Sequence, residues 1–261
     1  MEIALGFIIS VFIALTGVGA GSLTTPLLIL LLGLPAGEVV GTALIFGAVV
    51  KLFTVPTYMV RKQVDYKVLA YMLGTGLPGV LIGAVLLHKI PMHLMTGMVG
   101  LTIMSIALLN LFRFAHVTRH DRKPWLAAIG FPIGIEMGFS SAGAGAIGAL
   151  ALMSLTTLSP AMIVGTDLTF GLGLSLVGGG IHAAMGSLNT TVLWKLLVGG
   201  IPGALIGSSI AAHMPSRKLR FALCVALVVI GAQLSWKSFN EYYTDYVTAH
   251  RSADVVHAAG K

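Results

Sequence analysis

The pattern of hydrophobic positions consists of long apolar runs separated by short polar stretches. An α-helix needs roughly 20 residues to cross a hydrocarbon core about 30 Å thick. Runs of this kind occur at 36–60, 68–87, 92–112, 161–185, 192–211 and 219–236. We expect each to form a transmembrane helix, with Pro78 and Pro202 kinking or locally breaking two of them.

Two further pairs of apolar runs are too short to cross a membrane. They are residues 4–15 with 23–33, and residues 127–139 with 147–157. A run of about 12 residues makes roughly 18 Å of helix, which reaches just past the membrane midplane. Glycine-rich segments at 16–22 and 140–145 separate the two members of each pair. Each pair forms either one broken spanning helix or a re-entrant hairpin that returns to its starting side.

The two halves of the chain are related by a constant offset of 124 residues. The offset aligns Gly41-Thr42-Ala43-Leu44 with Gly165-Thr166-Asp167-Leu168, Pro78-Gly79 with Pro202-Gly203, and Gly19-Ala20-Gly21 with Gly143-Ala144-Gly145. Apolar bias alone does not place matched glycines and prolines at one offset over about a hundred residues, so we interpret the pattern as an internal duplication. Such repeats are the usual plan of secondary transporters, whose substrate site lies at the repeat interface near the midplane.

The positive charges predict the orientation. They gather in three loops, as Arg61, Lys62 and Lys67, then Arg113, Arg119, Arg122 and Lys123, then Arg217, Lys218 and Arg220. Among the connections at 34–37, 88–91 and 186–191, the one Lys or Arg residue is Lys89. Cytoplasmic loops of membrane proteins are enriched in Lys and Arg, so the three cationic loops are predicted to be cytoplasmic. If residues 127–157 crossed the membrane, the uncharged loop at 186–191 would be cytoplasmic and the cations at 217–220 would not. The short pairs are therefore predicted to be re-entrant hairpins.

The predicted fold class is therefore an all-α membrane protein with two inverted repeats, each a re-entrant helical hairpin plus three transmembrane helices. We divide the chain into repeat 1 (1–113), a cytoplasmic linker (114–126), repeat 2 (127–236) and a C-terminal tail (237–261). Both termini are predicted to be extracytoplasmic. The chain opens Met1-Glu2-Ile3 without the positive charge of a signal peptide, so we expect its first apolar run to be retained.

Composition supports the membrane assignment. The chain is 56% hydrophobic and 10% charged, whereas soluble proteins contain about 25% charged residues. The net charge of +7 follows from the cationic loops, so we expect no nucleic-acid partner. Cys224 is the single cysteine, which excludes an intrachain disulfide and a cysteine metal cluster. We predict no metal and no cofactor.

The glycine-rich segments are the predicted substrate site. Glycine accepts unusual backbone angles and lets a ligand approach the amides, and the free N–H groups at the start of the following half-helix favour anions. The predicted substrate-binding residues are Gly19, Ala20, Gly21, Ser22, Thr42, Ser140, Ser141, Gly143, Ala144, Gly145 and Thr166. The alternative role of these small residues is close helix packing.

Ionisable residues inside a membrane are costly and often functional, and three are candidates for proton or charge coupling. Lys51 either balances the charge of an anion or extends its amine toward the interface. Glu136 either carries a proton or is a hydrogen-bonded structural acid. Asp167, which replaces Ala43 of the first half, is either a proton relay or an acid favoured by the helix dipole. His182 is interpreted as a packing or interfacial residue.

The order of these motifs resembles the TauE/SafE sulfite exporter family. A glycine-rich tip is followed by Pro26-Leu27-Leu28 and Gly41-Thr42-Ala43-Leu44, and the second copy contains Gly143-Ala144-Gly145 and Gly165-Thr166-Asp167-Leu168. The resemblance covers residues 5–236. The chain departs from the family pattern at Ala20 and Ala144, where a third glycine is common, and at Leu150, where the second copy often has proline.

The resemblance implies a multi-pass permease of the bacterial inner membrane, driven by the proton gradient, with the substrate at the glycine tips. Our leading hypothesis is a secondary transporter, not an enzyme, that exports small sulfur-containing anions such as sulfite or sulfoacetate. The alternatives are a passive anion channel and an intramembrane enzyme. The implied partners are a small inorganic or organosulfur anion, protons and membrane lipid. The sequence leaves open the oligomeric state, the direction of transport and the coupling ion.

Overall fold

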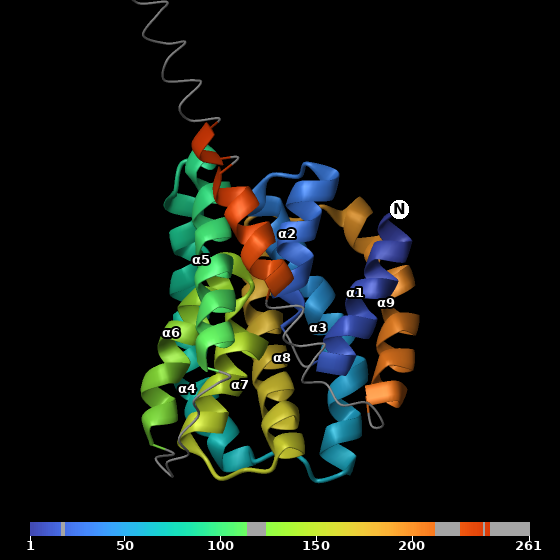
Figure 1. Cartoon of the computed structure of the whole chain (residues 1–261), viewed down its shortest axis with the longest axis vertical. Coiled ribbons are helices and arrows are strands. Elements are labelled where there is room, and N and C mark those ends of the chain that lie inside the picture. Colours follow the sequence, from blue (N-terminus) through green and yellow to red (C-terminus); the bar gives the residue numbers. More distant parts are fainter. Residues whose placement is uncertain (17–18, 114–123, 212–224, 237, 241–261) are drawn as a thin grey trace, which may run out of the picture.

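The computed structural model describes residues 1–16, 19–113, 124–211, 225–236 and 238–240, and every regular element within these ranges is a helix (Figure 1). The helices are α1 (Glu2–Thr16), α2 (Ala20–Leu32), α3 (Ala36–Val60), α4 (Tyr66–Lys89), α5 (Met92–Arg113), α6 (Trp125–Ser140), α7 (Gly143–Leu155), α8 (Pro160–Ala184) and α9 (Thr190–Ala211). A further helix covers 225–236.

Four of the described helices, α3, α4, α8 and α9, are long and apolar enough to cross a membrane by length and composition. They correspond to four of the six predicted spans. The predicted span at 92–112 forms helix α5, whose apolar part is Leu94–Leu109. The last predicted span is described only from residue 225, where it is helical. Helices α4 and α9 continue through Pro78 and Pro202.

Large apolar side chains cover the outer faces of these helices. On α4, for example, Leu81, Ile82, Val85 and Leu86 are all exposed, and on α9 so is Trp194. A soluble protein rarely leaves so much contiguous apolar surface uncovered. The outward side chains match the requirement of a lipid environment, so the fold is that of a multi-pass helical membrane protein.

The two predicted short pairs are present as α1 with α2 and α6 with α7. Figure 1 shows that α1 begins and α2 ends at the upper end of the molecule, whereas α6 begins and α7 ends at the lower end. The second pair is interrupted by Ser141, which has a φ of 65°, and by non-helical Ala144 and Gly145, the latter with a φ of 93°. Each pair therefore meets at a break in the interior.

Helix positions in the two halves follow the 124-residue offset. Helices α3 and α8 begin at Ala36 and Pro160 and end at Val60 and Ala184, and α4 and α9 begin at Tyr66 and Thr190. The same offset also relates the residues that begin α4 and α9. Asp65 Oδ1 accepts hydrogen bonds from the N–H groups of Lys67 (3.0 Å) and Val68 (3.1 Å). Asn189 Oδ1 accepts one from Val192 N (3.1 Å), so both are N-caps.

Helices from different halves pack against each other at glycine positions. The longest contacts join α1 to α9 and α4 to α6. A Cβ on Gly79 would overlap the carbonyl oxygen of Phe131, and a Cβ on Gly203 would lie 2.5 Å from that of Phe7. The two contacts are equivalent, because the 124-residue offset relates Gly79 to Gly203 and Phe7 to Phe131. Glycine permits this backbone approach, which explains the matched glycines after Pro78 and Pro202.

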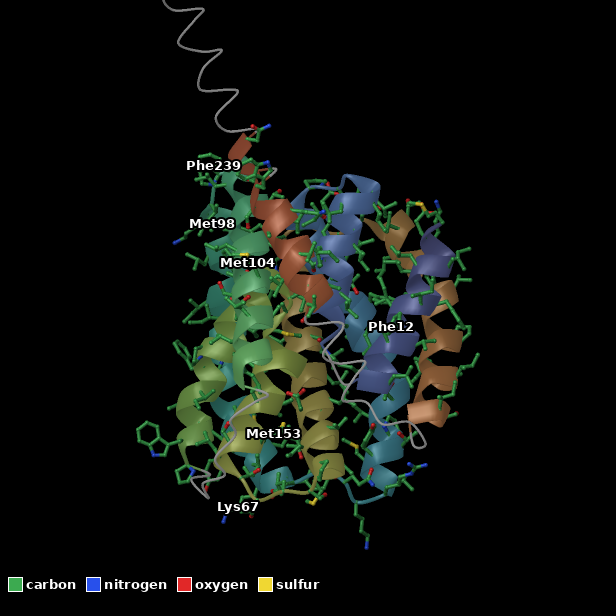
Figure 2. The ribbon with its side chains drawn as sticks, viewed as in Figure 1. Phe12, Lys67, Met98, Met104, Met153 and Phe239 are labelled. Carbon is green, nitrogen blue, oxygen red and sulfur yellow. The ribbon has the colours of Figure 1, made fainter. Side chains whose placement is uncertain are left out.

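The cation-poor connections lie together at one end of the molecule. His88 Nε2 and Ser187 Oγ are 2.7 Å apart, and Asn189 Nδ2 donates a 3.4 Å hydrogen bond to Glu38 Oε2. Figure 2 shows Lys67, from the first cationic loop, at the opposite end from Phe239. The other two cationic loops lie outside the described residues apart from Arg113, as do Cys224 and the predicted tail from residue 241 onward.

Candidate anion site at the helix breaks

The two helix breaks contact each other in the interior. We call residues 19–22 tip 1 and residues 140–145 tip 2. A Cβ on Gly19 would overlap the carbonyl oxygen of Ala144, and a Cβ on Gly21 would overlap Ser141. These glycines are therefore required by the close approach of the tips, independently of any ligand. Close packing and substrate binding are compatible roles at this position.

Buried hydroxyl groups link the two tips. Ser22 Oγ donates a 3.1 Å hydrogen bond to the carbonyl oxygen of Ala142, and Thr25 Oγ1 lies 2.6 Å from Ser141 Oγ. The side chains of Ser22, Thr25 and Ser141 are all buried. Thr25 was absent from the predicted set, although it lies one helical turn after Gly21. The sequence feature that could have identified Thr25 is its position in the helical turn that follows a predicted tip.

Two alanines take the place of the third glycine in the tips. The Ala20 side chain lies against Gly47, and the Ala144 side chain lies against Gly171, where an added Cβ would be 3.2 Å from that of Ala144. Gly47 and Gly171 are themselves related by the 124-residue offset. The missing side chains on α3 and α8 thus make room for the two alanine methyl groups.

Glu136 supports tip 2 from within its own half. Ser140 Oγ donates a short hydrogen bond to Glu136 Oε1 and accepts one of 3.3 Å from Ala142 N. Glu136 also lies near Gly143, because a Cβ there would be 3.1 Å from that of Glu136. The carboxylate is partly buried and fixes the Ser140 hydroxyl beneath the tip.

The Lys51 side chain points into the protein. Its Nζ donates hydrogen bonds to the carbonyl oxygen of Gly171 (3.2 Å) and to Ser175 Oγ (2.9 Å), both on α8. Lys51 is only 2% exposed, so in this structure its amine does not extend to the interface. Gly171 lies between the amine and tip 2, because a Cβ on Gly171 would be 3.1 Å from Lys51 Nζ and 3.2 Å from the Cβ of Ala144. Ser175 was not predicted, although it is the residue at the Lys51 position plus 124.

Asp167 contacts the same tip from α8. Its Oδ1 accepts a 3.3 Å hydrogen bond from the backbone N–H of Gly145, and a Cβ on Gly148 would overlap it. Asp167 is 2% exposed. Asp167, Gly171 and Ser175 are spaced four residues apart and share one face of the helix. A buried carboxylate and a buried ammonium group therefore face tip 2 together.

Thr42 and Thr166 make equivalent contacts that stabilise helix starts. Thr42 Oγ1 donates to the Glu38 carbonyl oxygen (2.7 Å) and accepts from Asn189 N (3.0 Å). Thr166 Oγ1 accepts from Asp65 N (3.0 Å). These hydroxyls thus connect α3 to the start of α9 and α8 to the start of α4. Their predicted contact with substrate stays a prediction.

His182 lies fully buried between helices. Its Nε2 donates a 3.0 Å hydrogen bond to the carbonyl oxygen of Gly138, and its ring centroid lies 5.1 Å from that of His88. This is the packing role expected from the sequence. Among the described residues, no group of three His, Cys, Asp or Glu side chains is arranged to hold a metal ion.

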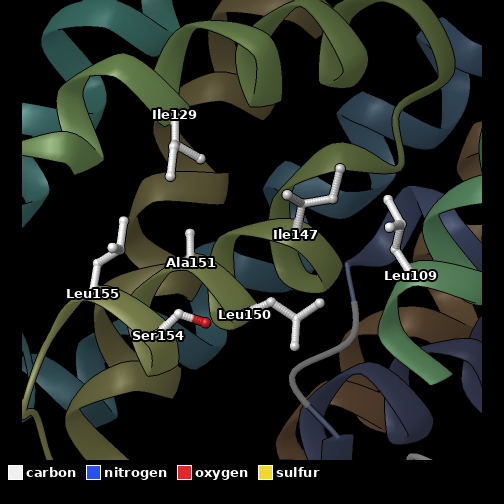
Figure 3. Close-up of a pocket in the computed structure, with 7 residues that line it drawn as sticks. All are labelled: Leu109, Ile129, Ile147, Leu150, Ala151, Ser154 and Leu155. Atoms are coloured by element: carbon white, nitrogen blue, oxygen red, sulfur yellow. The ribbon is translucent and has the colours of Figure 1, made fainter. Parts of the chain in front are cut away.

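A separate apolar cavity of about 370 Å³ lies between α5, α6 and α7 (Figure 3). Its lining residues are Leu109, Ile129, Ile147, Leu150, Ala151, Ser154 and Leu155. Ser154 supplies the single polar side chain in this lining, and none of the predicted substrate-binding residues contributes. The cavity is therefore distinct from the cluster of polar groups at the tips.

Apolar helices enclosing buried polar groups at two helix breaks define a multi-pass helical membrane protein. The chain belongs to the TauE/SafE family, because the family model described as "Sulfite exporter TauE/SafE" matches residues 2–234. This match confirms the family resemblance noted in the sequence.

Two relatives from Bacillus subtilis (strain 168) are similar over most of their length. The probable membrane transporter protein YjnA is 29% identical over 249 residues, covering 89% of this chain and 98% of the relative. The probable membrane transporter protein YdhB is 27% identical over 237 residues, covering 87% and 96%. No solved structure gave a significant match. The family and these names point to a membrane transporter rather than an enzyme.

Proposed function

We propose that the protein is a secondary transporter that exports small sulfur-containing anions such as sulfite or sulfoacetate across the bacterial inner membrane. The observation that carries this proposal is the Lys51 ammonium group, buried beside the contact between the two tips. A buried positive charge attracts a compensating anion, and the substrate would compete for this role with the Asp167 carboxylate. The family name supports the choice of sulfite-like substrates.

The proposed topology has two inverted repeats, each with a re-entrant hairpin. It is supported by the opposite directions in which the α1–α2 and α6–α7 pairs open (Figure 1). The location of Lys67 at the end opposite the cation-poor connections supports a cytoplasmic assignment for that end. Both termini are then extracytoplasmic.

The proposed substrate site combines backbone N–H groups of the tips with the hydroxyl groups of Ser22, Thr25 and Ser141. An oxyanion presents several acceptor oxygens, and hydrogen bonds from such donors to a charged acceptor are stronger than those between neutral groups. Lys51 supplies the positive charge. Sulfite and sulfonate groups are compact and rich in oxygen, so they suit a small site surrounded by donors.

Alternating access requires the tips to separate toward one side and then the other. The tip side chains are buried here, so the described conformation corresponds to an occluded state of the proposed cycle. Since α1 packs along α9 and α6 packs along α4, each hairpin would move together with a helix from the other repeat. Because each hairpin packs on a helix of the other repeat, the movement of one hairpin would be coupled to the movement of the other.

The test uses purified protein in liposomes, with flux of sulfite and sulfoacetate measured with and without an imposed pH gradient. Gly21→Leu and Gly145→Leu are expected to abolish flux, because Gly21 adjoins Ser141 and Gly145 has a φ of 93°. Gly180→Leu is the matched control, since a Cβ there meets nothing within 4 Å. All variants are compared at equal amounts of folded protein.

Gradient-dependent flux that disappears in both tip variants and persists in the control supports the proposal. Flux that is indifferent to the gradient would instead favour the passive channel. Absence of flux of either anion in folded wild-type protein would remove the substrate assignment. Conversion of a membrane-bound substrate without flux would favour an enzyme.

A further inference from the structure

We infer that Asp167 carries the proton that accompanies the anion, because its carboxylate occupies the Gly145 N–H that the anion requires. Protonation of Asp167 frees this amide, so each monovalent anion crosses the membrane together with one proton, and export then runs on the outward gradient of the anion itself rather than on the proton gradient that the family resemblance implied. This inference rests on the proposed function and assigns its coupling ion, its stoichiometry and the residue responsible.

The first argument is geometric. Asp167 Oδ1 accepts a hydrogen bond from Gly145 N (3.3 Å), at the point where α7 resumes its helical course after the break. Backbone N–H groups at such a helix start favour an anion. In the described state that anion is the protein's own carboxylate. The substrate and the Asp167 carboxylate compete for the same donor.

The second argument is the charge balance in the buried site. Lys51 and Asp167 are both 2% exposed and both border tip 2, so an ammonium group and a carboxylate at these positions together carry no net charge. A monovalent anion added to this pair would leave one uncompensated negative charge in a membrane interior, which is strongly unfavourable. Transfer of one proton to the Asp167 carboxylate restores neutrality, leaving Lys51 paired with the anion.

Three other titratable groups of the packed helices have contacts of their own, and one of them, Glu136, also touches tip 2. Tyr58 of α3 lies against Gly165, Asp65 caps α4, and the Glu136 carboxylate of α6 accepts from Ser140. The described part of α7 contains no Asp, Glu, His, Lys or Arg. Among the described residues, Asp167 is thus the carboxylate that contacts Gly145, and it lies one helical turn from Gly171, whose carbonyl oxygen accepts from Lys51.

The third argument is the asymmetry between the two halves. The offset of 124 places Ala43 at the position of Asp167 and Ser175 at the position of Lys51. The duplicated scaffold therefore carries one charge of each sign at its centre instead of two matched pairs. Asp167→Ala introduces the residue found at the equivalent position of the first half, which makes it a conservative test of the carboxylate.

The experiment measures anion flux and luminal pH together in proteoliposomes, using methanesulfonate, a small sulfonate that carries a single negative charge throughout the neutral range. If only sulfite is carried, wild type and variants are compared with the same anion, so that titration of sulfite itself cancels. Wild-type uptake is expected to acidify the lumen.

Asp167→Asn and Asp167→Ala are expected to carry the anion without acidification, so that net charge moves and flux responds to membrane potential. The half-saturating anion concentration at neutral pH should fall by about tenfold and lose its pH dependence, because the competing carboxylate is gone. Glu2→Gln, an acid-to-amide change at a partly exposed position at the start of α1, is expected to retain wild-type coupling.

The inference is overturned if folded Asp167→Asn still acidifies the lumen as it takes up anion, or if wild-type uptake makes the lumen more alkaline. It is also overturned if both Asp167 variants, shown to be folded by gel filtration and thermal unfolding, lose anion binding, since Asp167 would then be a structural anchor of tip 2. Absence of anion flux in the wild type would defeat the proposed function itself. The two failures are thus distinguishable.

Discussion

The Lys51 amine donates a 2.9 Å hydrogen bond to the hydroxyl group of Ser175, the residue at the same position in the second half of the chain. A residue that contacts its own counterpart lies where the two halves of the chain pack against each other. The contact therefore places Lys51 between the two halves, where α3 packs against α8.

Lys51→Gln is expected to reduce anion flux by about tenfold or more, because the positive charge opposite the anion is removed. The variant also weakens the buried hydrogen bonds to Gly171 and Ser175 and removes a positive charge near the Asp167 carboxylate, which lowers stability by about 1–3 kcal/mol. Thermal unfolding in detergent and flux in liposomes measure the two effects. The double variant Lys51→Gln/Asp167→Asn should recover stability but not transport, and recovery of both would contradict the role given to Lys51.

Gly21→Ala is expected to destabilise the protein by about 1–3 kcal/mol, because its Cβ would overlap Ser141 at the contact between the tips. Gly180→Ala, at an open position, serves as the control. The measurement is the midpoint of thermal unfolding for each variant. Equal midpoints would mean that the tips do not approach each other as described.

Glu136→Gln is expected to lower stability by about 1 kcal/mol, because it weakens the hydrogen bond from Ser140 that fixes the end of α6. Proton coupling should persist in this variant if Asp167 is the proton carrier. The luminal pH assay checks this directly. Loss of acidification with anion flux retained would transfer the coupling role from Asp167 to Glu136.

The proposed orientation predicts that cysteines at opposite ends react from opposite sides of the membrane. In a Cys224→Ser background, Lys67→Cys should be labelled by a membrane-impermeant maleimide only in inside-out vesicles. Ser187→Cys, in a cation-poor connection, should be labelled in intact spheroplasts. The reverse pattern would invert the topology while leaving the helical packing unchanged.

The sequence by itself determined the helical membrane class, the positions of the long apolar helices, the breaks at the tips and the family. These features depend on local properties, namely the length of apolar runs and the placement of glycine and proline. The constant offset even anticipates equivalent helix bounds, as at Ala36 and Pro160. Local composition suffices here because a membrane helix must satisfy its own backbone hydrogen bonds.

Only the tertiary structure decided which polar groups meet. Lys51 and Gly171 are 120 residues apart, and the amine had two physically reasonable destinations until α3 was seen against α8. In the same way, the Asp167 carboxylate reaches Gly145, whereas the Thr166 hydroxyl beside it turns to the start of α4. Contacts between distant segments depend on the relative rotation of packed helices. Hydrophobic periodicity does not specify that rotation in helices that are apolar on nearly every face.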